Sequence, residues 1–331
     1  NTAQFAVGER TELAFDVPAR CSDRNGGMVT LSGTITNRPT SGVLVIQYGG
    51  RTTFVGAQSG SFSLQTPPGT HDLVVTHAVS EGNGEFYTDE TLVVRDLTVN
   101  GPTMRTINFY DSDYAQYFTV DASVPNLNAR IVAATTLYTA NGTSIGLTRE
   151  STNWESNALA TPQMRTSDVY DQSISVTTLS TSITVTNATN APADQTYVAP
   201  PPLGSVTTMA VAKMPYATLQ STWPAYGSAI GYSWNATQQL NAQQCAGNNG
   251  CTIVWTSLVS PGVVGSMPGY RMPDLAGVTG WKPQFELVNG ATVVGGVTAM
   301  TSTAGAGDFP PATPASGTKR AFVRSDYSVT P

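Results

Sequence analysis

The segment Gly142–Gly146 has the spacing of a nucleophile elbow, the strand-to-helix turn that exposes the catalytic serine of α/β-hydrolases. It reads Gly-Thr-Ser-Ile-Gly, with Ser144 in the nucleophile position. Such an enzyme needs an acid and a histidine later in the chain, whereas the two histidines here, His71 and His77, both precede the serine. Asn141 and Gly142 instead form a pair that favours a two-residue hairpin. We therefore predict a hairpin turn and no active site at this position.

The histidines and carboxylates offer no other catalytic set. His71 and His77 are six residues apart, which along one strand is roughly 20 Å, too far for both to bind one ion. Glycosidases need a defined pair of carboxylates, and nothing in the sequence ranks Glu150, Glu155 or Glu286 for that role. Phosphate-binding glycine loops are absent. We expect a non-catalytic protein; a hydrolase without a sequence signature is the alternative.

Three aspartates suggest one metal site. Asp111 and Asp113 stand between two strand-rich regions, and Asp121 follows them closely. Calcium takes six to eight oxygen ligands, so these carboxylates and nearby carbonyls would suit an ion that stiffens a module junction. The spacing lacks the glycine and the final acid of an EF-hand loop. A solvated linker is the alternative, and no other cofactor is expected.

Aromatic side chains gather in the last third of the chain. Four of the five tryptophans lie there: Trp223, Trp234, Trp255 and Trp281. An exposed indole ring can stack on the apolar face of a sugar, which would make this region a glycan-binding module. A tryptophan in a β-sandwich also packs into the core, and no spacing here selects an exposed platform. Both interpretations stay open at this stage.

The cysteines are few but informative. Cys245 and Cys251 enclose Ala-Gly-Asn-Asn-Gly, a turn-forming sequence, so we predict a disulfide that closes a short loop. A zinc site would need about four ligands, and no other cysteine or histidine lies nearby. Cys21 is left over, and we expect it to be a buried thiol or a cross-link to another chain.

Composition points to an exposed, extracellular type of surface. Charged residues make up 11% of the 331 residues, against about 25% in typical soluble domains. The net charge is −6 and no basic run occurs, which argues against a nucleic-acid partner. No apolar stretch reaches the length of a membrane-spanning helix. We expect a secreted or cell-surface protein whose signal peptide has been removed, because the chain starts at Asn1.

Alternating apolar and polar residues mark strands in the first third of the chain. Between residues 28 and 112 the period of two recurs in seven segments, and Pro67-Pro68-Gly69 interrupts it with a turn. The sequence Gly60-Ser-Phe-Ser-Leu-Gln-Thr-Pro-Pro-Gly-Thr-His71-Asp-Leu-Val-Val75 resembles the carboxypeptidase regulatory-like (transthyretin-like) domain family, with His71 where that family has Tyr. The resemblance covers about residues 28–110. It implies a β-sandwich that serves as a non-catalytic module of secreted or surface proteins.

The remaining residues are also rich in strand signals. Residues 113–200 and 201–331 contain many Val, Ile, Thr and Tyr segments separated by turns, and Ala199-Pro-Pro-Pro-Leu203 places a boundary between them. The best helical segment, Ala236–Ala246, is short. We predict an all-β chain of two or three tandem Ig-like or transthyretin-like antiparallel sandwich modules: 28–112, 113–200 and the Trp-rich 201–331. An extended segment, 1–27, precedes them.

Taken together, these features predict a structural or adhesive protein. We expect its partners to be other copies of itself or other surface proteins, and it could form a filament or appendage. The alternating residues of segment 1–20 suggest a strand that inserts into a neighbouring subunit, or one that completes the first sandwich. A carbohydrate-binding surface protein that uses the third module is the alternative.

Overall fold

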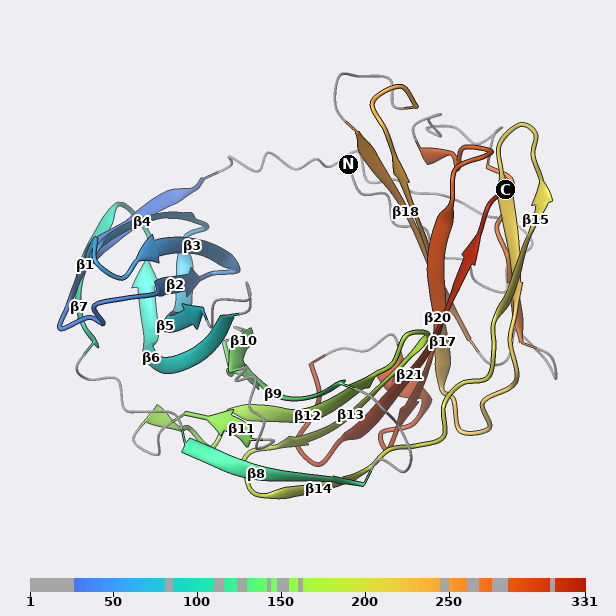
Figure 1. Ribbon diagram of the computed structural model, residues 1–331. Coiled ribbons are helices and arrows are strands. Elements are labelled where there is room, and N and C mark those ends of the chain that lie inside the picture. Colours follow the sequence, from blue (N-terminus) through green and yellow to red (C-terminus); the bar gives the residue numbers. More distant parts are fainter. Residues whose placement is uncertain are drawn as a thin grey trace.

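The computed structural model describes residues 27–80, 86–109, 116–123, 130–141, 144–147, 155–159, 163–244, 250–260, 268–275, 285–309 and 313–331. Over these residues the chain forms strands and short 3₁₀ turns such as η4 (Ala306–Asp308), with no α-helix. The predicted all-β class is confirmed, with several antiparallel sheets arranged as tandem sandwich layers (Figure 1). None of the described residues forms a helix long and apolar enough to cross a membrane.

The first sandwich consists of two sheets packed face to face. Its strands are β1 (Val29–Thr36), β2 (Val43–Tyr48), β3 (Arg51–Gly56), β4 (Ser61–Thr66), β5 (Gly69–Ser80), β6 (Phe86–Val99) and β7 (Thr103–Asn108). One sheet has the order β4-β1-β7, with β1 and β7 parallel, and the other has the order β3-β2-β5-β6. The alternate residues Leu31, Leu44, Ile46 and Leu73 fill the core between the sheets. The seven segments expected from the alternation correspond to the seven strands of this sandwich.

The hairpin between β2 and β3 shows why the turns could be read from the sequence. Tyr48 pairs with Arg51 across the turn, and the two intervening residues, Gly49 and Gly50, have φ of 55° and 72°. A two-residue hairpin with both central residues at positive φ is a type I′ turn, which glycine adopts without steric cost.

Strands from the middle and from the end of the chain form one long sheet. The following strands are β8 (Gln116–Ser123), β9 (Arg130–Tyr138), β10 (Ser144–Leu147), β11 (Glu155–Ala158), β12 (Val169–Thr177), β13 (Thr181–Thr189) and β14 (Gln195–Val198). They are followed by β15 (Thr207–Ala212), β16 (Thr218–Thr222), β17 (Gly231–Leu240), β18 (Cys251–Val259), β19 (Gly269–Arg271), β20 (Val293–Ser302) and β21 (Lys319–Val329). Eight of these strands form one sheet in the order β10-β9-β12-β13-β21-β20-β17-β18.

This sheet changes the expected division of the chain. The proline run at 199–203 does not separate two sheets, because β13 before it pairs with β21 after it, with Ile183 opposite Val323. Figure 1 shows the sheet as an arc, with β10 near the first sandwich and β18 at the far end. Two small sheets, β11-β8-β14 and β15-β16-β19, accompany it. The regions predicted as second and third sandwiches therefore share one main sheet.

The predicted helical segment is also corrected. Residues from Ala236 to Leu240 belong to β17, which pairs with β18 on one side and β20 on the other. Ala236 and Trp234 lie on the same face of β17 and are fully buried, with Tyr232 beside them. The alternation of buried residues along β17 is the period of a strand, and it outweighs the weak helical pattern at its end.

A substitution at Val323 measures how much the packing of the central strand, β21, stabilises the long sheet. This residue of β21 is fully buried and lies between Ile183 of β13 and Ala299 of β20. We expect Val323→Ala to lower the free energy of unfolding by about 2 kcal/mol, through lost apolar burial and a residual cavity. The measurement is denaturant unfolding followed by tryptophan fluorescence. Ser328→Ala, at an exposed position of the same strand, should change stability by less than about 0.5 kcal/mol; equal effects would contradict this packing.

Candidate functional site

The tryptophans mostly pack into the core. Trp234 is fully buried and its Nε1 donates to Ser221 Oγ at 2.8 Å, and Trp223 is 4% exposed. Both belong to the core cluster of the long sheet. Trp255 is half-buried against that cluster and donates its Nε1 to the Phe285 carbonyl at 2.9 Å. Trp281 lies outside the described residues. The core interpretation therefore holds for Trp223 and Trp234, whose rings are not accessible to a sugar.

The predicted calcium ligands are not brought together by any described contact. Asp111 and Asp113 lie outside the described residues, and Asp121 belongs to β8, opposite Thr196 of β14 in the parallel pair. Within the described part of the chain, no group of three or more acidic, histidine or cysteine residues is placed to hold a metal ion. The calcium site thus stays a prediction.

Of the three cysteines, Cys251 lies within the described residues. Cys251 opens β18 and is disulfide-bonded. Its partner lies outside the described residues, as do both Cys245 and Cys21, so the pairing of Cys245 with Cys251 stays a prediction.

Ser144 lies on β10, and His71 and His77 lie on β5. Ser144 opens β10, which pairs with β9 as an antiparallel hairpin, with Ser144 opposite Tyr138. β9 and β10 therefore form a hairpin, whereas the two-residue turn predicted at Asn141-Gly142 lies partly outside the described residues and stays a prediction. His71 meets the Tyr48 ring edge-on at a centroid distance of 5.3 Å. His77 is buried, with Nε2 2.8 Å from the Ser41 carbonyl oxygen.

A densely connected polar cluster of the described residues lies where the first sandwich contacts the long sheet. It begins at an irregularity in β6, where Arg95 and Asp96 together lie opposite the single residue Asp72 of β5. Asp96 has a φ of 54°, in the left-handed region. Such a bulge places one extra residue in a strand and redirects its side chain. Arg95 and Asp72 thereby join the outer face of the β5–β6 pair.

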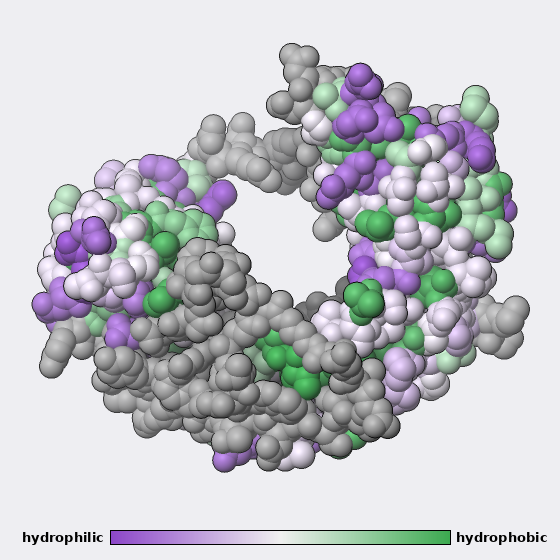
Figure 2. Space-filling model, viewed as in Figure 1, coloured by the Kyte–Doolittle hydropathy of each residue, from purple (hydrophilic) through white to green (hydrophobic). Residues whose placement is uncertain are grey.

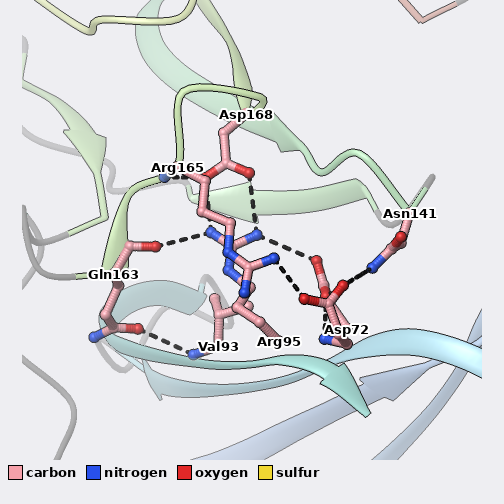
Figure 3. Close-up of polar contacts among 8 residues, drawn as sticks. Asp72, Val93, Arg95, Asn141, Gln163, Arg165 and Asp168 are labelled. Atoms are coloured by element: carbon pink, nitrogen blue, oxygen red, sulfur yellow. Dashed lines mark hydrogen bonds and ion pairs between the residues drawn. The ribbon is translucent and has the colours of Figure 1, made fainter. Parts of the chain in front are cut away.

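Arg95 binds one aspartate of the first sandwich, Asp72, and one aspartate next to the long sheet, Asp168. Its Nη1 lies 3.2 Å from Asp72 Oδ2 and 3.0 Å from Asp168 Oδ1, and its Nη2 lies 2.7 Å from Asp168 Oδ2. Nη2 also donates to the Gln163 carbonyl at 2.9 Å. Figure 3 shows the guanidinium between the two carboxylates. The side chains of Asp72 and Asp168 are 2% and 0% exposed, and that of Arg95 is 10% exposed, so this is a buried, partly bidentate ion pair.

A second group of contacts surrounds this pair. Asp72 Oδ1 accepts the Asp96 backbone N–H at 2.9 Å and Asn141 Nδ2 at 3.1 Å. Asn141 Nδ2 also lies 2.8 Å from Asp96 Oδ1, while Arg165 Nη1 reaches Asp96 Oδ2 at 2.7 Å. The Arg165 backbone N–H donates to Asp168 Oδ2 at 2.9 Å. We call Asp72, Arg95, Asp96, Asn141, Gln163, Arg165 and Asp168 the joint cluster.

Apolar packing lies beside the joint cluster. Val74 and Val93 are on the outer face of the first sandwich, two residues from Asp72 and Arg95 respectively, and they are buried in a core shared with the long sheet. The other side of that core consists of Leu137, Ile145, Leu147, Ala158, Leu159 and Tyr170. β5 is consequently buried on both faces from residue 72 to residue 78. The joint therefore combines hydrophobic burial with a buried ionic network.

The protonation equilibria fit a structural role. Burial raises the pKa of Asp72, but the hydrogen bond from the Asp96 amide, further side-chain hydrogen bonds and the charge of Arg95 outweigh it, so the pKa lies below its usual value. The hydrogen bond from Arg165, then that from Asn141, lowers the pKa of Asp96. Both carboxylates are therefore held in the charged form, and their oxygens are occupied by donors of the joint.

The joint cluster was not singled out from the sequence. Arg95 is 73 residues from Asp168, and no local pattern connects residues at that distance. One signal was present: Arg95-Asp96 interrupts the apolar run of Leu92, Val93 and Val94 in a chain with little charge. A charged pair inside an apolar strand indicates either a bulge or a buried partner.

Comparison with known proteins assigns no family. No family model matches the chain, and no curated protein matches it. Among solved structures, a DUF3823 family protein from Bacteroides ovatus is similar at 17% identity, over 45% of this chain and 90% of that one, with a TM-score of 0.17. A streptococcal ancillary pilin is similar at 9% identity, over 81% of this chain and 89% of that one, also with a TM-score of 0.17. The resemblance of residues 28–110 to the carboxypeptidase regulatory-like family stays a prediction.

Removing the guanidinium of Arg95 should uncouple the joint. We expect Arg95→Ala to lower the free energy of unfolding by about 3–5 kcal/mol, because it leaves two buried carboxylates without their counter-charge. Arg165→Ala is the matched control: it removes an arginine of the same joint whose side chain is 44% exposed, and it should cost clearly less than Arg95→Ala because solvent screens an exposed ion pair. Denaturant unfolding of both variants measures the difference. Equal losses would show that the buried pair is not the stabilising element.

The lowered pKa of Asp72 gives the joint an acid dependence. Its stabilising contribution is complete above the unfolded-state pKa of about 3.9 and is lost as the pH falls through the lower folded-state value. The stability difference between wild type and Asp72→Asn should therefore be larger at neutral pH than at about pH 3. Free energies of unfolding at the two pH values measure it. A difference that stays constant or grows in acid would contradict the assignment.

Proposed function

We propose that the chain is a non-catalytic structural or adhesive protein of the secreted or cell-surface type, and that it assembles with other copies of itself. The observation that carries the proposal is that the joint cluster connects two layers of the chain. Its buried charges are engaged with one another across the contact between the first sandwich and the long sheet. A site that fixes the relative position of two β-layers suits a protein whose task is to hold a shape.

The surface composition supports the same proposal. The chain is poor in charge and rich in hydroxyl and amide residues, and the face seen in Figure 2 intermixes hydrophilic and hydrophobic residues. The glycan-binding alternative loses support, because Trp223 and Trp234 are core residues. The proposal extends to strand exchange through residues 1–20, which contain two short runs, 5–7 and 13–17, with apolar residues at every second position.

Assembly is the property to measure first. Light scattering after size exclusion, with negative-stain microscopy, should show oligomers or filaments of the full chain. A deletion of residues 1–20 should remove species larger than a dimer if strand exchange links the copies. A monomeric full chain at all concentrations would contradict the proposed assembly, and unchanged large species after the deletion would contradict strand exchange alone.

A further inference from the structure

The far end of the long sheet is an edge with unusual properties. Among the described residues, β18 has a strand partner, β17, on one side only. It is nine residues long, contains no charged residue and no proline, and pairs with β17 in unbroken register from Tyr232 opposite Val259 to Leu240 opposite Cys251. Figure 1 shows it at the end of the arc remote from β10.

The other described edges carry features that discourage pairing. β10, β11, β14 and β19 have four residues or fewer. β3, β6 and β7 contain arginine, and β15 has a register shift. Short length, charge and bulges are the means by which sheet edges avoid joining another chain. β4 has neither charge nor bulge but is only six residues long, so β18 is the longest uncharged edge.

The side chains of β18 suit pairing with an identical strand. On the open face of the sheet, Val254 is 62% exposed and Leu258 is 48% exposed, with exposed Thr256 between them. In an antiparallel pair centred on Thr256, each Val254 lies opposite the Leu258 of the other copy. On the other face, Ile253, which is 7% exposed, lies opposite Val259, also 7% exposed, so that both apolar layers continue across the junction.

We propose that β18 is a self-association edge, where two copies of the chain pair antiparallel about Thr256 and join their long sheets into one. The partner is a second copy because this register places Val254 opposite Leu258 on one face and Ile253 opposite Val259 on the other, and because the strand carries no charge that would repel its twin. Such a contact is isologous and closes at two copies. This inference rests on the proposed assembly and names one of its contacts.

A charge at the edge tests the pairing, and the chain offers a matched control. Val254→Lys places a cation where it would face Leu258 of the other copy, and it should weaken self-association by roughly tenfold or more. Val294 lies in the same cross-strand row, with Thr237 between it and Val254, and is 52% exposed on the inner strand β20. Val294→Lys adds the same charge to the same face away from the edge and should leave self-association unchanged.

Cysteine substitution tests the register. Thr256→Cys brings two thiols opposite each other, where Cα atoms of antiparallel partners are about 4.5–5.5 Å apart, within disulfide range. It should give a covalent dimer on mild oxidation. Thr252→Cys, also exposed on β18, would lie eight residues from its mate, about 26 Å away, and should not.

The outcomes separate the two proposals. Light scattering across a concentration series, with far-UV circular dichroism to confirm folding, should show dissociation for Val254→Lys only. If the wild type assembles and both lysine variants assemble equally well, the β18 edge is overturned while the proposed function stands. If both lysine variants dissociate, the contact is the open face and edge pairing is wrong. A monomeric wild type overturns this edge together with the proposed assembly.

Discussion

The pairing of β13 with β21 is the constraint on which the rest of the structure depends. β21 is the last strand of the chain, and it lies between β13 and β20 in the long sheet. The register joins residues 181–187 to residues 319–325, so the main sheet forms only when the chain has returned across more than a hundred residues. Val185 of β13 packs against two core clusters, the one that contains Trp234 and the one that contains Tyr197. Two regions that the sequence separates at a proline run thereby share one continuous packing surface.

The joint cluster extends this continuity to the first sandwich. Arg95 and Val93 lie on the same outer face, so the ionic contacts and the apolar contacts act on the same pair of layers. The hydrophobic part supplies burial without direction, whereas the bidentate contact of Arg95 with Asp168 fixes one orientation. A structural protein benefits from both, because a joint that is only apolar can slide. Two buried nitrogens of the polar part, Arg95 Nε and Gln163 Nε2, have no hydrogen-bond partner.

Local features of the fold were predictable from the sequence and non-local ones were not. The strands of the first sandwich could be placed because a period of two and glycine turns such as Gly49-Gly50 are local signals. The partner of β13 and the partner of Arg95 depend on residues distant along the chain, and a single sequence contains no record of those pairings. Trp234 illustrates an intermediate case: its residue type allowed a core or a sugar platform, and only its position on β17 decided between them. The helical pattern at Ala236 failed because tertiary pairing overrides weak local propensity.

Native-state hydrogen exchange across β13, β20 and β21 tests the continuity of the long sheet most directly. If one sheet joins the two regions, amides in these three strands should exchange with one common free energy of opening, since no strand can leave without breaking its neighbour's ladder. The result that would contradict this account is exchange of β13 together with β9 and β12 while β20 and β21 stay protected. That outcome would mean two independent sandwiches divided at residues 199–203, as the sequence alone predicted.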